Sequence, residues 1–343
     1  MVQMTRINWR AVAQSLLRPE MVALLPALTL GSYWLGGERL LLLLAVTLPA
    51  LTATLASMER RWRNQPAPAR ATPPRPETEL LRKAFERGEF RAFFQPQLST
   101  DTGRISGMEV LARWQHPEQG LLAPAMFLPA IEAAGLSERL SEIMIAQGLS
   151  AIKGWDAMSL HVPTVAVNLS AADLRNPRLT ARLQWELERF DLAPSRFTVE
   201  ILETVAAALH EDAIEETVRS LSAIGCGIDL DDFGVRHGAL DLLRRYPVRR
   251  IKIDRSFVTR LDQDRNQQRM LTAILCLADQ LGLTTLAEGV ETTGEHTMLA
   301  QLGCGHVQGY GIARPMGLSD ATIWIEQHRA KLTQTPQIGR RAS

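Results

Sequence analysis

Cysteine is scarce in this chain, and neither sign of charge is in excess. Its 343 residues include three cysteines, Cys226, Cys276 and Cys304, which are widely spaced and form no Cys-x-x-Cys pair. This pattern argues against a disulfide framework and against a zinc site. The chain has 38 lysines and arginines against 37 aspartates and glutamates. Its net charge therefore gives no reason to expect a DNA or RNA polymer as a partner.

Charge is also absent from two long stretches near the N-terminus. Residues 21–37 carry none, and a second uncharged run, 40–58, follows Glu38 and Arg39. Each run has about the length of a membrane-crossing helix, roughly 17 to 25 residues. We predict two transmembrane helices with both ends in the cytoplasm, because arginines flank the pair on its outer sides: Arg6, Arg10, Arg18, Arg60, Arg61 and Arg63. A buried helical hairpin in a soluble protein is the alternative.

Proline and arginine then replace the apolar residues. Residues 59–77 have no apolar period, which predicts a semi-extended basic linker. Its arginines either contact anionic lipid headgroups or simply face water. The linker separates a membrane anchor, residues 1–58, from a barrel domain, residues 78–330, and residues 331–343 are expected to form a flexible tail.

Short β-rich runs alternate with helix-length segments from residue 78 onward. Alternation of this kind predicts crossover connections and a mostly parallel sheet, and eight runs over about 250 residues fit a closed barrel. The first two runs are separated only by "LSTDTGR", which is too short for a helix, so we expect a hairpin and one antiparallel strand. The predicted fold class is α/β, a modified TIM-type (β/α)8 barrel. The runs are 90–97, 105–114, 164–170, 197–204, 226–233, 249–257, 284–290 and 306–310.

Polar residues recur within or at the end of these runs. Taken singly, each has an ordinary interpretation as a loop carboxylate, a strand-end turn residue or a surface lysine. Together they would meet at one rim of a barrel, where catalytic groups converge. Several carboxylates and an amide at one rim suggest hard cations with oxygen ligands, as in two-metal phosphoryl transfer. The residues are Glu109, Asn168, Glu200, Asp231, Asp232, Lys252, Glu288 and Gln308.

The order of these motifs resembles a known family. The chain contains "FFQP", "EVLAR", "VNLS", "EILET", "DDFG", "IKID", "AEGVET" and "QGY" in sequence, and this order is similar to that of the EAL family of cyclic di-GMP phosphodiesterases. The resemblance covers roughly residues 78 to 330. It implies a modified barrel that hydrolyses one phosphodiester of cyclic di-GMP to linear 5′-pGpG with two Mg²⁺ or Mn²⁺ ions. "EVLAR" stands where the family has "EALxR". No "GGDEF" motif occurs, so synthesis of cyclic di-GMP is not expected.

The resemblance also implies roles for single residues. Glu109, Asn168, Glu200 and Asp231 would hold the first metal ion, and Asp231 with Asp232 the second. Lys252 would contact the attacking water, and Glu288 would be either a metal ligand or the general base. Glu203 would anchor the loop after Asp232. Substrate contacts would come from Gln95, Leu111, Arg113, Asp254, Glu291 and Gln308.

One loop departs from the family's pattern. Family members with activity usually read "DDFGTGYSSL" or "DDFGAGYSSL", whereas this chain reads "DDFGVRHGAL", with Val235, Arg236, His237 and Gly238. An arginine in place of a glycine costs about 1 kcal/mol or more where φ is positive, so the loop is expected to follow a different path. In the family this loop positions the aspartates and contributes to a dimer contact.

Two interpretations remain open. The first is a phosphodiesterase tethered to the bacterial inner membrane, with the barrel in the cytoplasm and a homodimer through the barrel. The second is a receptor that binds cyclic di-GMP or a protein partner without turnover.

Overall fold

The computed structural model describes residues 76–202, 212–235 and 239–334. The two predicted transmembrane runs, Glu203 and the loop residues Arg236, His237 and Gly238 lie outside these ranges. Within the described ranges, none of the helices has the length and apolar character needed to cross a bilayer.

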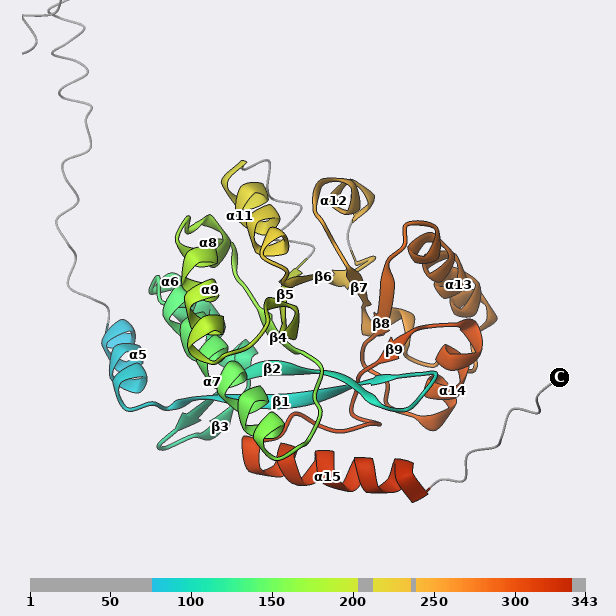
Figure 1. The fold of residues 1–343 in the computed structure, drawn as a ribbon, viewed down its shortest axis with the longest axis horizontal. Helices are drawn as coiled ribbons and strands as arrows, with labels where there is room; N and C mark the ends of the chain where they lie inside the picture. Colours follow the sequence, from blue (N-terminus) through green and yellow to red (C-terminus); the bar gives the residue numbers. More distant parts are fainter. Residues whose placement is uncertain (1–75, 203–211, 236–238, 335–343) are drawn as a thin grey trace, which may run out of the picture. The chain divides into compact units, whose positions relative to one another are not determined.

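Eight strands close into a barrel at the centre of the domain (Figure 1). The order around the barrel is β1-β9-β8-β7-β6-β5-β4-β2, and β2 pairs with β1 to complete the circle. All eight predicted runs therefore contribute a strand, and the predicted α/β barrel is confirmed. The strands are β1 (Phe90–Ser99), β2 (Ile105–His116), β4 (Val165–Asn168), β5 (Phe197–Leu202), β6 (Gly227–Phe233), β7 (Arg250–Ile253), β8 (Thr284–Ala287) and β9 (His306–Val307).

Strand β1 runs against its neighbours. It pairs antiparallel with β2 and with β9, whereas the other barrel pairings are parallel. The predicted hairpin is thus confirmed, and its register places Gln95 opposite Glu109. A short ninth strand, β3 (Gly120–Leu122), extends the sheet beyond the end of β2, and the sequence did not predict it.

Helices surround the barrel and cover its outer face (Figure 1). In α9 (Leu179–Arg189) the buried residues Leu179, Leu183 and Leu187 recur every four positions, as expected for one buried face. The other helices are α5 (Pro76–Glu86), α6 (Leu128–Ala133), α7 (Ser137–Ala157), α8 (Ala171–Arg175), α11 (Asp212–Ala223), α12 (Ala239–Arg245), α13 (Arg265–Gln280), α14 (Thr293–Leu302) and α15 (Leu318–Gln334). Single 3-10 turns are η1 (Pro124–Met126), η2 (Pro194–Arg196) and η3 (Arg255–Phe257).

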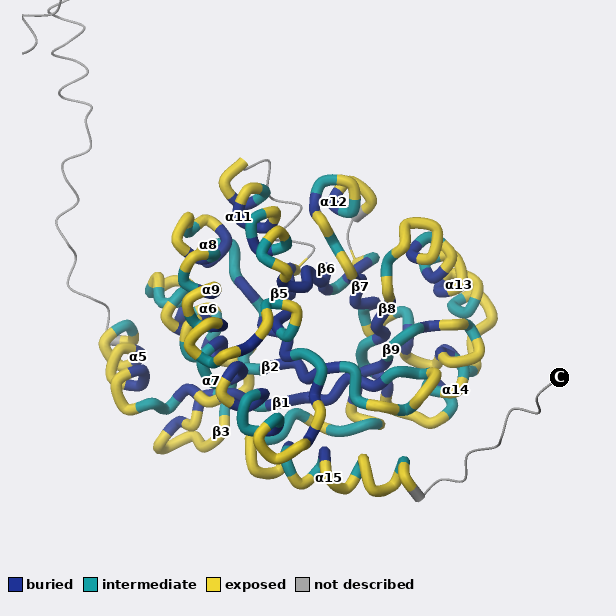
Figure 2. Tube along the Cα trace, viewed as in Figure 1, coloured by how far each residue is buried: buried dark blue, intermediate teal, exposed yellow. Residues whose placement is uncertain are grey.

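The apolar core lies between the strands and the helices. In β5, Phe197, Val199 and Ile201 are buried apolar residues, and they alternate with Thr198 and Glu200. Because successive side chains of a strand point to opposite faces, the apolar set faces the helices and the polar set faces the barrel interior. Figure 2 shows the resulting layers, with buried strands inside and exposed helix surfaces outside. The interior is therefore polar, which is unusual for a packed barrel core.

Candidate functional site

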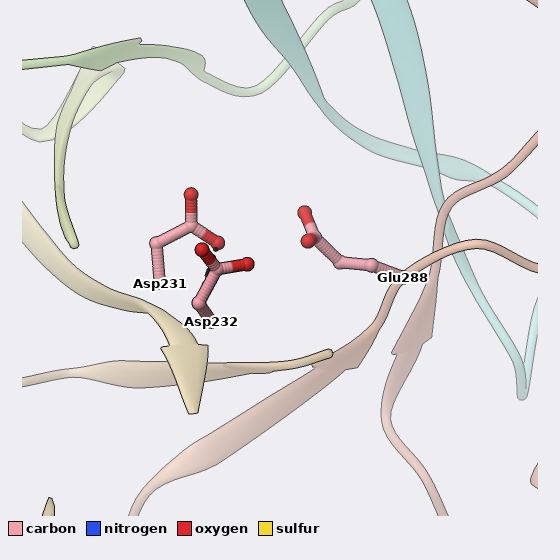
Figure 3. Close-up of side chains that lie close together, drawn as sticks. All are labelled: Asp231, Asp232 and Glu288. Carbon is pink, nitrogen blue, oxygen red and sulfur yellow. Dashed lines mark hydrogen bonds between the residues drawn. The ribbon is translucent and has the colours of Figure 1, made fainter. Parts of the chain in front are cut away.

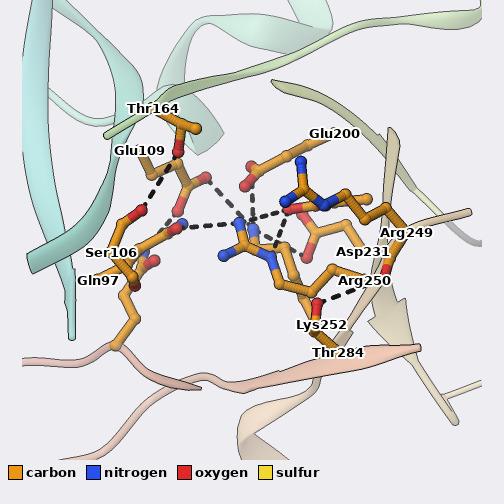
Figure 4. Close-up of polar contacts among 12 residues, drawn as sticks. Gln97, Ser106, Glu109, Thr164, Glu200, Asp231, Arg249, Arg250, Lys252 and Thr284 are labelled. Carbon is orange, nitrogen blue, oxygen red and sulfur yellow. Dashed lines mark hydrogen bonds and ion pairs between the residues drawn. The ribbon is translucent and has the colours of Figure 1, made fainter. Parts of the chain in front are cut away.

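A cluster of charged and amide side chains fills the barrel interior toward the carboxyl ends of the parallel strands (Figure 4). Alternation along each strand explains this, because every second residue faces inward. The cluster unites eight of the predicted residues through direct contacts: Gln95 on β1, Glu109 on β2, Asn168 on β4, Glu200 on β5, Asp231 on β6, Lys252 on β7, Glu288 after β8 and Gln308 after β9.

Lys252 lies at the centre and is fully buried. Its Nζ is 2.8 Å from Glu288 Oε1, 2.9 Å from Glu200 Oε2 and 3.1 Å from Asp231 Oδ1. A fourth carboxylate, Glu109 Oε1, is 3.7 Å away. Burial alone would lower the pKa of Lys252, but the four carboxylates outweigh burial and raise it well above its usual value. The lysine is therefore an ammonium group and a hydrogen-bond donor.

Two amides connect the carboxylates. Asn168 donates from Nδ2 to Glu109 Oε1 at 2.8 Å and to Glu200 Oε2 at 3.1 Å. Gln308 donates from Nε2 to the other oxygen of Glu109 and to Gln95 Oε1. Burial would raise the pKa of Glu109, but the charge of Lys252 and these hydrogen bonds lower it overall. Glu109 is thus held as a carboxylate.

The other carboxylates are less well compensated. Burial, followed by the charge of Glu109, raises the pKa of Glu200 well above its usual range despite Lys252. Burial raises the pKa of Glu288 to about 8, with Lys252 opposing and Asp231 adding to the shift. The pKa of Asp232 is also raised, by burial and by Asp231. The site consequently offers more carboxyl groups than one ammonium group can keep ionised, so some of them hold a proton when no cation is bound.

The paired aspartates occupy an irregular part of β6. The ladder between β6 and β7 is regular through Leu230 and shifts before Phe233, so Asp231 and Asp232 fall in the irregularity. Asp232 has φ of 57° and donates its N–H to Asp231 Oδ1 at 2.9 Å. A positive φ is uncommon for a residue other than glycine, although aspartate tolerates it better than most, and such residues concentrate at functional sites. The irregularity turns both carboxylates toward Glu288 (Figure 3).

This geometry fits divalent cations. Asp231, Asp232 and Glu288 each offer an oxygen, and the three atoms lie within 4.8 Å of one another. In addition, Glu200 Oε1 is buried without a hydrogen-bond partner among the described residues. Carboxylate oxygens are the ligands that Mg²⁺ and Mn²⁺ prefer. The donor set therefore suits a hard cation at the aspartate pair and a second one toward Glu200.

The predicted substrate contacts are more dispersed. Gln95 lies inside the cluster and donates to Ala313 O at 3.0 Å. Arg113 is half-buried above the ring of Phe93, with 5.7 Å from its guanidinium carbon to the ring centre. Leu111 lines a mostly apolar cavity of about 490 Å³ that also contacts Asn168.

Two further predicted contacts lie on loops after the strands. Asp254 caps η3 by accepting the N–H of Ser256, and it faces Asp232 closely enough to raise the pKa of that residue. Glu291 is exposed, and Glu295 Oε2 accepts its N–H at 2.9 Å. This hydrogen bond fixes the backbone of the loop, while the exposed Glu291 side chain lies apart from the buried cluster.

The loop that carries Glu288 and Glu291 is held by local structure. Gly289 has φ of 70°, and a Cβ there would lie 2.5 Å from Arg255 Cβ, so a side chain at this position is excluded. Glu295, in the first turn of α14, accepts the N–H groups of Arg260, Glu291 and Thr292. Hydrogen bonds to Glu295, at the end of the "EGVETTGE" segment, therefore fix the backbone of the loop that carries Glu288 and Glu291.

A second ionic layer lies beneath the cluster, and the sequence did not single it out. Arg250 donates from Nε to Asp229 Oδ2 at 2.7 Å and from Nη2 to Gln97 Oε1 at 2.9 Å. All three side chains are buried. Each lies two positions from a cluster residue on the same strand, which is the period that could have identified them.

Comparisons with known proteins agree with this architecture. The EAL domain family matches residues 78–315. RocR of Pseudomonas aeruginosa, named a cyclic di-GMP phosphodiesterase, is 35% identical over 234 residues, which are 68% of this chain and 59% of that protein. DosP of Escherichia coli, named an oxygen sensor protein, is 33% identical over 245 residues, 71% of this chain and 30% of that protein.

Solved structures show the same similarity. A phosphodiesterase domain of MucR in complex with c-di-GMP has a TM-score of 0.67 and 34% identity, covering 71% of this chain and 99% of that one. A FimX EAL domain from Pseudomonas aeruginosa bound to c-di-GMP has a TM-score of 0.65 and 27% identity, covering 71% of this chain and 97% of that one. This chain spans 30% and 59% of the full lengths of DosP and RocR. The family match covers more than half of its residues, and the chain therefore belongs to the EAL domain family.

Proposed function

We propose that this protein hydrolyses one phosphodiester bond of cyclic di-GMP and releases linear 5′-pGpG, using two Mg²⁺ or Mn²⁺ ions. The observation that carries the proposal is the convergence of Glu109, Glu200, Asp231 and Glu288 around the ammonium group of Lys252. The relatives named as cyclic di-GMP phosphodiesterases support the choice of substrate.

The carboxylates divide into two ligand groups. Asp231, Asp232 and Glu288 would hold one ion, since their oxygens already lie within 4.8 Å of one another. Glu109, Asn168 and Glu200, together with Asp231, would hold the other. Ions held by these residues would polarise the phosphodiester and lower the pKa of the attacking water toward neutrality.

Lys252 orients the attacking water. Its raised pKa keeps the ammonium group protonated, so Nζ donates a hydrogen bond and does not accept a proton. Glu288, with its pKa raised to about 8, holds a proton at neutral pH and gives it up when it takes its place as a ligand. Gln308 and Asn168 keep Glu109 oriented through their hydrogen bonds.

The substrate would lie across the rim of the barrel. Arg113, half-buried beside Phe93, offers a planar guanidinium to a phosphate oxygen or a guanine edge. Leu111 would contact a base from the 490 Å³ cavity. The remaining contacts would come from Gln95, Asp254, Glu291 and Gln308.

Incubation of the purified full chain with cyclic di-GMP and Mn²⁺, followed by chromatographic separation of nucleotides, tests the proposal. We expect 5′-pGpG from the wild type and a loss of turnover in Glu109→Gln. The matched control is Glu326→Gln, an exposed position on α15. Wild-type protein that binds cyclic di-GMP without producing the linear dinucleotide would refute the hydrolase.

A receptor that binds cyclic di-GMP or a protein partner without turnover is the second candidate. The departure at residues 235–238 favours it, because the altered loop follows directly on Asp231 and Asp232. Binding without turnover in the assay above is its signature.

We also propose a bacterial inner-membrane location with the barrel in the cytoplasm, on the strength of the uncharged runs 21–37 and 40–58 and their flanking arginines. We expect a reporter that works only in the cytoplasm to be active when it is fused after residue 63. A reporter that works only in the periplasm should be inactive at the same position. A homodimer through the barrel is proposed from the exposed Val235 and Leu240 near the altered loop. Sedimentation at several protein concentrations tests it.

A further inference from the structure

The ionic layer beneath the cluster has a regular relation to the site. Gln97, Asp229 and Arg250 each precede or follow a cluster residue by two positions on the same strand. Gln97 follows Gln95 on β1, Asp229 precedes Asp231 on β6, and Arg250 precedes Lys252 on β7. Since side chains two apart share a face, both layers point into the barrel. Figure 4 shows Gln97 and Arg250 of this layer close to Lys252 of the cluster.

Arg250 joins strands that are not neighbours. Asp229 is its direct partner across the β6–β7 ladder, whereas Gln97 lies on β1, which is separated from β7 by β8 and β9. The guanidinium therefore reaches across the barrel interior. Gly107 makes room at the far side, because a Cβ there would lie 3.0 Å from Gln97 Oε1 and 2.7 Å from Thr164 Oγ1.

The position of the Asp229–Arg250 pair along the ladder is significant. Asp229 and Leu230 are the last regularly paired residues of β6 before the irregularity that holds Asp231 and Asp232. Beyond this point β7 does not fix the β6 backbone in regular register. The guanidinium of Arg250, which binds Asp229 Oδ2 and Gln97 Oε1 immediately before the irregularity, therefore sets where the irregularity begins.

A contribution to stability explains this layer poorly. Buried ion pairs contribute little net stability, and apolar residues of similar volume often replace them without loss. We propose that Asp229, Arg250 and Gln97 are positioning residues that fix the register of β6 and β7 and thereby hold Asp231, Asp232 and Lys252 in metal-binding geometry. The inference rests on the proposed two-metal function.

The double variant Asp229→Leu/Arg250→Met tests it, because it removes the pair without leaving an unpaired buried charge. Measured on the full chain, Mn²⁺ affinity by calorimetry without nucleotide, and kcat for cyclic di-GMP, are each expected to fall about 10- to 100-fold, the range for residues that support metal ligands. KM should change little, and the thermal midpoint should fall only by the cost of leaving the buried Gln97 Oε1 without its donor. The control is Arg249→Met, the exposed neighbouring arginine, which is expected to match wild type.

Arg250→Lys keeps a positive charge beside Asp229 but loses the planar guanidinium that donates to both Asp229 and Gln97. It should therefore show an intermediate loss of Mn²⁺ affinity. It also serves as the test if the double variant does not fold. A folded double variant with wild-type Mn²⁺ affinity and kcat overturns the positioning role, as does wild-type affinity in Arg250→Lys. Wild-type protein without turnover would instead refute the hydrolase, and the Mn²⁺ comparison would still decide the role of the layer.

Discussion

Replacing Lys252 by methionine removes the ammonium group from the centre of the carboxylate cluster. Four carboxylate oxygens lie between 2.8 and 3.7 Å from its Nζ in the folded protein. Removing one partner of a buried ion pair costs about 3 to 5 kcal/mol because the remaining charge is uncompensated. With about 2 to 4 °C of midpoint per kcal/mol for a domain of this size, we expect Lys252→Met to unfold roughly 6 to 20 °C below wild type in EDTA.

The loss should depend on pH in a defined direction. Without Lys252, the buried carboxylates Glu200 and Glu288, whose pKa values are already raised, bind protons more readily in the folded state. A group with a higher folded pKa stabilises the fold more as the pH falls, by about 1.4 kcal/mol per pH unit for one extra proton. The variant should therefore approach wild type toward pH 6 and differ most near pH 9.

Thermal unfolding followed by near-ultraviolet circular dichroism measures both effects. Lys153→Met is the control, because its ion pair with Asp191 is exposed and such pairs contribute about 0 to 1 kcal/mol. Mn²⁺ should raise the midpoint of Lys252→Met more than that of wild type, since a cation no longer competes with an ammonium group. Equal midpoints for Lys252→Met and wild type at pH 9 in EDTA would refute the charge distribution described for the cluster.

Three further outcomes follow from the structure. Mn²⁺ binding at pH 7 should release about one proton from Glu288, whose pKa is about 8. Calorimetry in buffers of different ionisation enthalpy should find the total release lower by about one proton in Glu288→Gln than in wild type. Burial, followed by the charge of Arg250, lowers the pKa of His306 to about 4. As the pH falls, the unfolded state therefore binds a proton at His306 that the folded state does not bind. Between pH 7.5 and 5 the free energy of unfolding of wild type should fall by about 1 to 2 kcal/mol, after allowance for partial exposure, and this fall should be missing in His306→Gln. Glu295→Ala should cost about 2 to 3 kcal/mol in chemical denaturation, because three backbone N–H groups lose their acceptor; an unchanged midpoint would contradict this account of the loop.

The barrel could be predicted because its strands are short β-rich runs between turn residues, and because inward positions carry polar residues at a period of two. Strand β3 could not, since three residues beginning with Gly120 give no periodic pattern. The run at 249–257 was also too long. Its strand ends at Ile253, because the Asp254 side chain accepts the N–H of Ser256 and begins η3.

The residues of the cluster were predictable, but their charge states were not. Glu109 and Glu200 are both buried glutamates, on strands that are separated by β4, and their pKa values shift in opposite directions. Burial raises the pKa of Glu200, and the charges of Glu109 and other carboxylates add to the rise despite Lys252. At Glu109, Lys252 and hydrogen bonds from Gln308 and Asn168 outweigh burial, while Glu200 Oε1 has no hydrogen-bond partner among the described residues. Such differences depend on distances between strands far apart in the chain.

The departure from the family's pattern begins at Val235, close to the paired aspartates, but Val235 makes none of the ion pairs of Lys252. Val235 is 55% exposed, and its N–H donates to Asp232 O at 3.4 Å. By contrast, the ion pairs of Lys252 are made by residues on β2, β5 and β6 and by Glu288 at the end of β8. A site built on strands is held by the barrel's hydrogen bonds and packing, whereas a loop is not. The contacts between the carboxylates and Lys252 are therefore all made by described residues outside 236–238. We expect the altered loop to affect the proposed turnover and the proposed dimer contact more than cation binding.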